Sequence, residues 1–167
     1  MKETIRYAWG QSTLGEFIAA VSAHGLVAVE FGDDRAQLKL DLLQRFAEAD
    51  VVEDHASLAD VIDKVIARIE QPRLDNELAL DLRGSDFELR VWQALRGIPA
   101  GATASYGDIA ARLGMPGMAR EVGQACAANT IAVLVPCHRV VKKDGSLSGY
   151  RWGVPRKRAL LEQEARA

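Results

Sequence analysis

The 167-residue sequence holds only two cysteines, Cys126 and Cys137. Two are too few for a disulfide framework or for a four-thiolate zinc site. Long hydrophobic runs are also missing, because no stretch approaches the ~20 apolar residues that a transmembrane helix needs. The segment from Met1 to Tyr7 has no apolar core of the kind that a signal peptide carries. We therefore expect no membrane association and a reducing, cytoplasmic setting in which the cysteines remain thiols.

An excess of one sign of charge is small in the chain as a whole, whose formal net charge is −2. Residues 1–84, however, carry 9 Lys and Arg against 16 Asp and Glu, a net of −7, whereas residues 85–167 carry 12 against 7, a net of +5. This asymmetry indicates that only the second half meets a polyanion. The alternative is that the halves attract each other, since an excess of five is modest for a nucleic-acid-binding surface.

Hydrophobic patterning predicts a small α/β unit in the first half. Three short apolar or alternating segments are predicted strands, with a hairpin turn at His24-Gly25 between the last two: residues 5–9, 17–21 and 26–31. Apolar residues at helical spacing predict helices over 34–47 and 57–69, the second starting at a Ser57–Asp60 capping box. Residues 78–82 form a further predicted strand. No group of residues suited to catalysis stands out here, and we place the domain boundary at residue 84.

The second half, residues 85–167, is predicted to be mostly helical. Capping boxes at Ser85–Glu88 and Ser105–Asp108 start two helices, and the second of these ends at Gly114–Gly117. A further helix follows from about 118 to 128. Two helices joined by a short glycine turn have the outline of a helix-turn-helix. A closing helix is predicted over 154–165.

The predicted helix at 118–128 has one face with almost no side-chain bulk. Ala119, Gly123 and Ala127 recur every fourth residue, although a glycine in a helix costs about 1 kcal/mol relative to alanine. Either another molecule approaches the backbone closely here, or the helix packs tightly on a neighbour. Arg120 and Gln124 are few for sequence-specific reading of the major groove. The pattern favours a shape-reading contact in the minor groove with Arg120 as a wedge, and the alternative for Arg120 is a solvated surface residue.

The segment Val133–Val141 places a cysteine and a histidine inside an apolar run, which is typical of a buried segment. Cysteine reacts as the thiolate, and since the unperturbed thiol has a pKa of roughly 8.5, a base would have to help at neutral pH. Neighbours in an extended strand face opposite sides. Cys137 and His138 can therefore cooperate only if the chain bends after Pro136 or if a water bridges them. The alternative is a buried structural cysteine.

The segment Pro136–Val140 resembles the signature of the O6-alkylguanine-DNA alkyltransferases, the methylated-DNA–protein-cysteine methyltransferases. Further segments match that family in order and spacing: residues 91–95, 98–99, 105–106, 126–129 and 147–153. The second half matches strongly and the first half loosely. The residues of the matching segments are most similar to those of the Ada-type repair domains. One departure is Thr130-Ile131-Ala132, which replaces a proline-containing version common in many members.

The resemblance implies an α/β, ribonuclease H-like subdomain over residues 1–84 and a mostly helical domain over 85–167 with a winged-helix-like helix-turn-helix. It implies direct-reversal DNA repair, in which the alkyl group of O6-methylguanine, and of O4-methylthymine, moves irreversibly to Cys137 after base flipping. The expected partner is double-stranded DNA bound through the minor groove by a monomer. No cofactor is expected. No metal is expected either, because members with structural zinc bind it through N-terminal Cys and His residues, and no cysteine precedes Cys126.

The resemblance also implies roles for individual residues. Cys137 would accept the alkyl group, His138 would take the thiol proton through a water, and Glu164 would orient the imidazole. Asn129 would brace the site by hydrogen bonds. Tyr106 would donate to the purine as its oxygen leaves.

The remaining implied roles concern the base pocket and the DNA. The pocket would be formed by the Val140 carbonyl and a glycine- and aromatic-rich loop: Ser148, Gly149, Tyr150, Arg151 and Trp152. The small-faced helix would contact DNA through five residues: Ala119, Arg120, Gly123, Gln124 and Ala127. Arg120 would fill the gap that the flipped nucleotide leaves.

Two other functions stay open on the residues alone. A DNA-binding module would keep the helix-turn-helix and leave Cys137 inert, as in alkyltransferase-like proteins, but those lack this cysteine. A cysteine hydrolase would use a Cys-His-Glu set, but it would leave the small-faced helix and the basic second half unexplained.

Overall fold

The computed structural model describes residues 2–166. The chain divides into two compact units, Met1–Leu82 and Arg83–Ala167. The first is a small mixed sheet with helices, and the second is mostly helical.

The sheet of the first unit has four strands: β1 (Thr4–Ser12), β2 (Gly15–Val21), β3 (Leu26–Phe31) and β4 (Asp50–Glu53). Their order is β3-β2-β1-β4, with β4 parallel to β1 and the other neighbours antiparallel. The predicted hairpin of β2 and β3 is confirmed. Strand β4 was missed because its two valines stand between charged residues. The strand predicted at 78–82 is reduced to a single bridge between Leu26 and Leu80.

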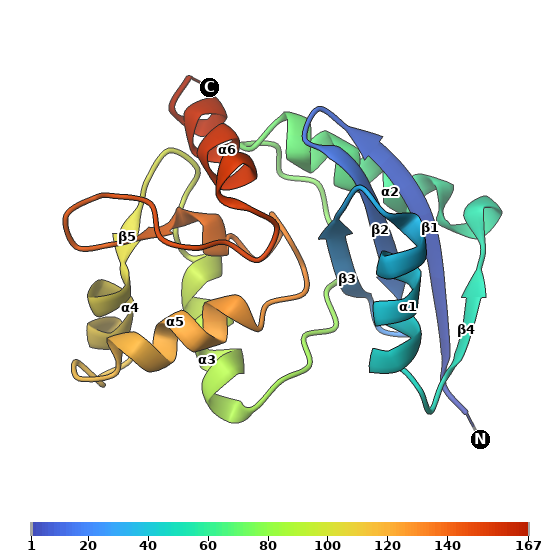
Figure 1. Cartoon of the computed structure of the whole chain (residues 1–167), viewed down its shortest axis with the longest axis horizontal. Coiled ribbons are helices and arrows are strands. Elements are labelled where there is room, and N and C mark those ends of the chain that lie inside the picture. The colour runs from blue at the N-terminus through green and yellow to red at the C-terminus, as the bar shows by residue number, and fades with distance from the viewer. Residues whose placement is uncertain (1, 167) are drawn as a thin grey trace. The chain divides into compact units, whose positions relative to one another are not determined.

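Two helices flank this sheet: α1 (Arg35–Arg45) and α2 (His55–Glu70). Figure 1 shows α1 in front of the sheet and α2 behind it. The capping box predicted at Ser57 is wrong, because Asp54 is the N-cap and its carboxylate accepts from the Ser57 amide at 3.1 Å. An aspartate three residues earlier satisfies that donor, so the helix starts two residues sooner than predicted.

The second unit has four helices within its described residues: α3 (Asp86–Arg96), α4 (Tyr106–Arg112), α5 (Ala119–Ala127) and α6 (Val154–Arg166). Both predicted capping boxes are confirmed, since Ser85 with Glu88 and Ser105 with Asp108 make the two reciprocal hydrogen bonds. The indole of Trp92 donates to the Ala125 carbonyl oxygen at 2.8 Å, which fixes α3 against α5.

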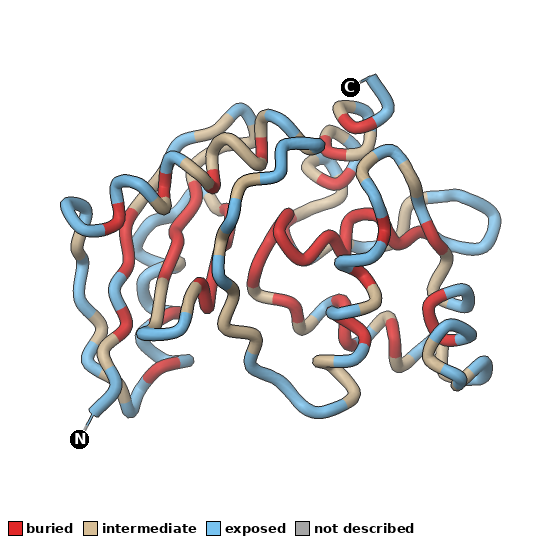
Figure 2. Tube along the Cα trace, turned by 180° about the vertical axis from the view of Figure 1, so that it is seen from behind, coloured by how far each residue is buried: buried red, intermediate tan, exposed pale blue. Residues whose placement is uncertain are grey.

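A small parallel pairing positions the functional segment of this unit. Strand β5 (Ala104–Ser105) pairs with β6 (Val140–Val141), which directly follows the turn η1 (Cys137–Arg139). Ala104 pairs with Val140, so the start of β5 lies beside the end of that turn and α4 begins just beyond the pairing. Every residue from 131 to 141 is buried, and Figure 2 shows buried positions gathered in the middle of this unit.

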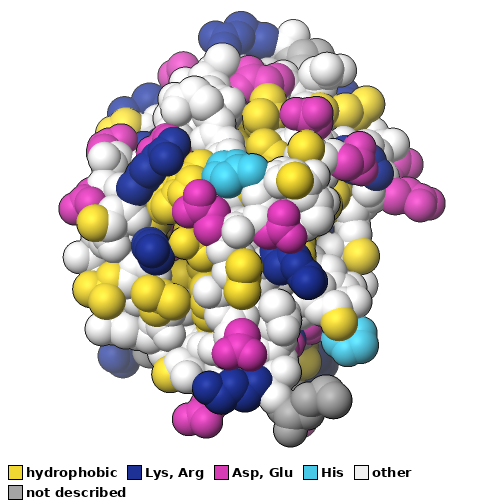
Figure 3. Space-filling model, turned by 90° about the vertical axis from the view of Figure 1, so that its right-hand side faces the viewer, with side chains coloured by type: hydrophobic (Ala, Val, Ile, Leu, Met, Phe, Trp, Pro, Cys, Tyr) yellow, Lys and Arg dark blue, Asp and Glu magenta, His cyan; other side chains and the backbone are white. Residues whose placement is uncertain are grey.

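The surface carries no broad field of one charge on the face that Figure 3 displays, where acidic, basic and apolar side chains are mixed. Among the helices in the described part of the chain, none combines the length and apolar character needed to cross a bilayer.

Candidate active site

The cysteine and histidine of the apolar run lie on a tight turn. After Pro136 the chain enters η1, in which the Cys137 amide donates to the Val135 carbonyl oxygen at 2.8 Å. The bend that cooperation between Cys137 and His138 requires is therefore present.

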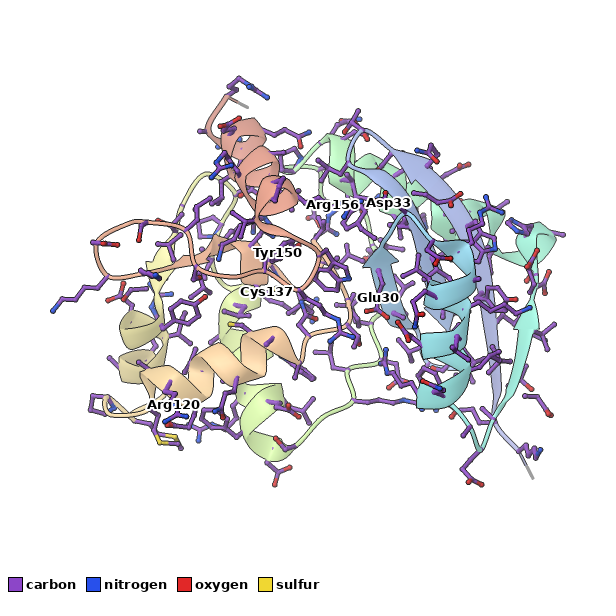
Figure 4. All side chains as sticks on the ribbon, in the orientation of Figure 1. Glu30, Asp33, Arg120, Cys137, Tyr150 and Arg156 are labelled. Atoms are coloured by element: carbon purple, nitrogen blue, oxygen red, sulfur yellow. The ribbon has the colours of Figure 1, made fainter. Side chains whose placement is uncertain are left out.

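A cavity of about 370 Å³, partly open to solvent, lies beside Cys137. Its volume falls within the usual range of small-molecule pockets. The Cys137 residue itself is only 5% exposed, and Figure 4 shows it close to Tyr150. The cavity lining is Tyr106, Gly123, Cys126, Ala127, Cys137, Gly149, Tyr150 and Arg151. Cys126 is buried and shares this cavity with Cys137.

Asn129 braces the turn by hydrogen bonds. Its buried amide nitrogen donates to the Val135 carbonyl oxygen at 3.0 Å and to the Cys137 sulfur at 3.3 Å, and its oxygen accepts from the Ile131 amide at 2.9 Å. Within this loop Val133 has φ of 70°, a left-handed conformation that is strained for a β-branched residue. The hydrogen bonds of Asn129 hold the loop in shape around that strained residue.

Behind the cysteine, His138 is fully buried against a carboxylate. Its Nε2 lies 2.7 Å from Oε2 of Glu164. A carboxylate can only accept, so Nε2 carries the proton and Nδ1 is the nitrogen able to receive one. This Nδ1 is buried and has no hydrogen-bond partner within residues 2–166.

Arg139 completes this buried set, and sequence reasoning gave it no role. Its Nε donates to Oε1 of Glu164 at 2.9 Å and its Nη2 to Oε2 at 2.8 Å, a two-pronged pairing of guanidinium and carboxylate. Its Nη1 donates to the Ile98 carbonyl oxygen at 2.7 Å. Its position next to the Cys-His pair was the only hint in the sequence, because nothing there shows that an arginine is buried.

Burial dominates the protonation of the cysteine. It raises the pKa of Cys137 to about 11, although the hydrogen bond from Asn129 and the charge of Lys157 partly oppose it. The free protein therefore holds a thiol at neutral pH, and the base has to act when the substrate is in place. Burial also raises the pKa of Cys126, which leaves no thiolate there to compete.

The pKa values of His138 and Glu164 are both lowered, which suits a proton relay. Burial lowers the pKa of His138, with partial opposition from Glu164, so the imidazole is neutral and able to accept a proton. Burial tends to raise the pKa of Glu164, but the hydrogen bonds from His138 and Arg139 outweigh it and lower the pKa to about 2. The carboxylate is thus charged throughout the neutral range and can stabilise an imidazolium.

Tyr106 also lines the cavity, and its hydroxyl is hydrogen-bonded to Oγ of Ser148. Lys157, another residue to which the sequence gave no role, is fully buried and donates to that same Oγ at 3.0 Å and to the Val140 carbonyl oxygen at 2.7 Å. The carbonyl expected to line the pocket is therefore already engaged by Lys157, with one lone pair left. Trp152 is buried and lies outside the cavity lining.

The small-faced helix α5 presents the expected side chains unevenly. Arg120, Gln124 and Ala127 are exposed, whereas Ala119 and Gly123 are half-buried. Figure 4 shows Arg120 at the N-terminal end of α5, away from Cys137. A Cβ added at Gly123 would meet only the Tyr106 ring, at 3.7 Å, which is ordinary contact. Tight helix packing therefore does not require this glycine.

Within residues 2–166, no group of three or more His, Cys, Asp or Glu side chains is arranged to hold a metal ion. The groups gathered at this site are a thiol, a neutral imidazole hydrogen-bonded to a carboxylate, and hydroxyl and amide donors around a cavity.

Comparison with known proteins agrees with this arrangement. A family profile described as the DNA-binding domain of 6-O-methylguanine DNA methyltransferase matches residues 86–166. The bifunctional transcriptional activator/DNA repair enzyme Ada of Escherichia coli is 46% identical over 161 residues, which cover 96% of this chain and 46% of that protein. The methylated-DNA–protein-cysteine methyltransferase of Mycobacterium tuberculosis (strain H37Rv) is 49% identical over 111 residues, 66% of this chain and 67% of that protein.

A solved structure is similar over nearly the whole chain. The crystal structure of Mycobacterium tuberculosis OGT in complex with DNA matches with a TM-score of 0.81 and 37% identity, covering 96% of this chain and 93% of that one. The chain therefore belongs to the methylated-DNA–protein-cysteine methyltransferase family. It spans about half the length of the Ada proteins that it matches.

Proposed function

We propose that this protein repairs alkylated DNA directly, by moving the methyl group of O6-methylguanine in double-stranded DNA onto Cys137. The observation that carries the proposal is the placement of the Cys137 side chain on a cavity, with the His138–Glu164 pair buried behind it. The names of the relatives and the DNA complex of the similar structure support the same reading.

The chemistry begins with a proton transfer. The thiol proton passes to Nδ1 of His138 through a water, and Glu164 stabilises the resulting imidazolium. The Asn129 amide donates to the sulfur and stabilises the thiolate as it forms. Placing the base in the cavity triggers this step, because the pKa of Cys137, raised by burial to about 11, keeps the thiol protonated before then.

Methyl transfer then consumes the protein. The S–C bond forms as the C–O bond breaks, and the electron pair of that bond goes to the purine oxygen. Tyr106, which lines the cavity, donates to the leaving purine. The thioether product has no easy route back to a thiol, so each molecule reacts once.

DNA is proposed to approach the small-faced side of α5, through the minor groove. Ala127 and Gly123 border the cavity and permit close approach of the backbone, while Arg120 would fill the space of a flipped nucleotide. Flipping costs a few kcal/mol and costs least for a damaged, weakly paired base. We propose that the protein acts as a monomer and without a cofactor.

Three finer points belong to the same proposal. We propose a ribonuclease H-like fold for the subdomain of residues 1–84 and a winged-helix-like fold for residues 85–167. The second domain carries the DNA contact and the catalysis. O4-methylthymine is proposed as a second substrate of the same pocket.

Intact-mass spectrometry tests the proposal directly. After mixing with a duplex that contains O6-methylguanine, the wild-type protein should gain the mass of one methyl group, and Cys137→Ala should gain none. Cys126→Ala is the matched control, since it removes the other cavity thiol and should still be methylated. A methyl group on any residue other than Cys137, or DNA binding without a mass change, would refute the assignment.

A further inference from the structure

Lys157 is an unusual residue for a protein interior, since a lysine is rarely buried without partners. It is fully buried on α6 and donates to the Val140 carbonyl oxygen and to Oγ of Ser148, at 2.7 and 3.0 Å. The relay of Cys137, His138 and Glu164 does not use it. It reaches the cavity residue Tyr106 only through Ser148, so it lies behind the cavity lining and calls for another role.

The direction of the hydrogen bonds behind the cavity lining follows from the chemistry of the groups. A lysine ammonium can only donate, so Oγ of Ser148 is the acceptor from Lys157. The single Ser148 proton can then be given to the Tyr106 oxygen, to which Ser148 is hydrogen-bonded. In that order the proton of Tyr106 is left to point at the cavity.

We propose that Ser148 and Lys157 are positioning residues, which hold Tyr106 as a donor to the leaving purine and pass a proton along the chain Lys157–Ser148–Tyr106. The inference rests on the proposed methyl transfer and deepens it. It assigns Ser148, which lies outside the cavity lining, a place behind Tyr106 rather than against the base.

The proton count balances. When the C–O bond breaks, the purine gains an electron pair and takes the Tyr106 proton. Tyr106 takes the Ser148 proton, and Ser148 takes one from Lys157, which ends as a neutral amine. The thiol proton stays on His138, so the total charge is unchanged. Burial lowers the pKa of Lys157, which makes this loss of a proton easier.

Ser148→Ala cuts the chain while leaving Lys157 and Tyr106 in place. At saturating O6-methylguanine duplex, we expect its single-turnover transfer rate to fall roughly 10- to 100-fold with no change in the DNA Kd. Tyr106→Phe should lose at least as much, and the double variant should be no slower than Tyr106→Phe alone, because the residues act as one unit. Ser146→Ala, an exposed serine of the same loop, is the matched control and should transfer at the wild-type rate.

A reagent without a purine separates positioning from general damage to the site. Iodoacetamide alkylates the Cys137 sulfur and releases iodide, which needs no proton, so Ser148→Ala should be labelled within about twofold of the wild-type rate. Equal transfer by Ser148→Ala and wild type, or an equal loss in the iodoacetamide reaction, would overturn the inference alone. A wild-type protein that left the duplex methylated would overturn the proposed function together with it.

Discussion

Burial acts on the two reacting side chains in opposite ways. It raises the pKa of Cys137 and lowers the pKa of His138, so both are neutral in the free protein. A neutral thiol beside a neutral base reacts slowly until a bound substrate makes the proton transfer favourable. If Cys137 is the proposed single-use acceptor, this protects its sulfur from stray electrophiles.

The titration of Cys137 gives the first prediction. In Cys126→Ala, where Cys137 is the only thiol, the rate of iodoacetamide labelling should rise with pH up to an apparent pKa near 11. The physical reason is the desolvation of the thiolate in the buried turn. Labelling measured by mass spectrometry across the pH range tests it. An apparent pKa near the ordinary roughly 8.5 would mean that the sulfur is not desolvated.

Glu164 gives a prediction about acid stability. Its folded pKa of about 2 lies below the value of about 4.3 in an unfolded chain. A depressed pKa stabilises the fold above the unfolded value, and this contribution is lost as pH falls toward 2. The lowered pKa of His138 adds to the loss in the same direction, starting below about 6.5.

Glu164→Gln should remove its part of this acid dependence. The free energy of unfolding at pH 7 should also fall, on the order of 3 kcal/mol, because Arg139 loses its buried counter-charge. Urea unfolding between pH 7 and 4 measures both effects. Glu162→Gln, an exposed neighbour on α6, is the control and should follow the wild type. A Glu164→Gln variant as stable as wild type would show that the ion pair contributes little.

At the scale of elements, the notable feature of helix α5 is the missing side chain at Gly123. Gly123 lies over the Tyr106 ring at the cavity and is not needed for packing. We therefore expect Gly123→Ala to raise the free energy of unfolding by about 0.5–1 kcal/mol through helix propensity. The same methyl group should slow transfer from duplex DNA roughly tenfold or more, because it stands where the DNA backbone is proposed to approach.

Two measurements on this variant separate the explanations. Urea unfolding reports the stability, and the single-turnover rate reports the transfer. A lower free energy of unfolding in Gly123→Ala would show that the glycine is needed for packing. Unchanged transfer would exclude close approach of DNA at this position.

Local signals allowed the sequence to predict most elements of the fold. The caps at Ser85 and Ser105 depend on residues within one helical turn, and both are present. Strand β4 was missed because a short edge strand flanked by charged residues resembles a loop in sequence. The cap at Asp54 was missed because Asp54 and Ser57 are both suitable capping residues. These are cases where tertiary pairing decides the outcome.

The candidate site was less predictable where burial of charge matters. The Cys-His pair stands out because its residue types are reactive and its surroundings are apolar. Arg139 and Lys157 look like ordinary surface cations, since a basic residue on a helix or next to a strand is usually solvated. Their partners, Glu164 and Ser148, lie far from them or on another element, so only the fold brings each pair together.

At the scale of the whole molecule, the proposed transfer would use up one protein molecule for each lesion repaired. The chain's acidic first half and basic second half differ in net charge by twelve, at −7 and +5. If the protein binds DNA as proposed, this charge difference favours contact through the half that carries Cys137. The relatives of the Ada type are about twice as long as this chain.

Stoichiometry under excess substrate tests the single-use transfer most directly. The protein is mixed with a tenfold excess of duplex containing O6-methylguanine, and methyl groups per molecule are counted over time by intact mass and located by peptide sequencing. We expect the count to stop at one, on Cys137, with nine-tenths of the lesions left in the DNA. A count that passes one, or repair of the whole excess, would contradict irreversible transfer to this sulfur.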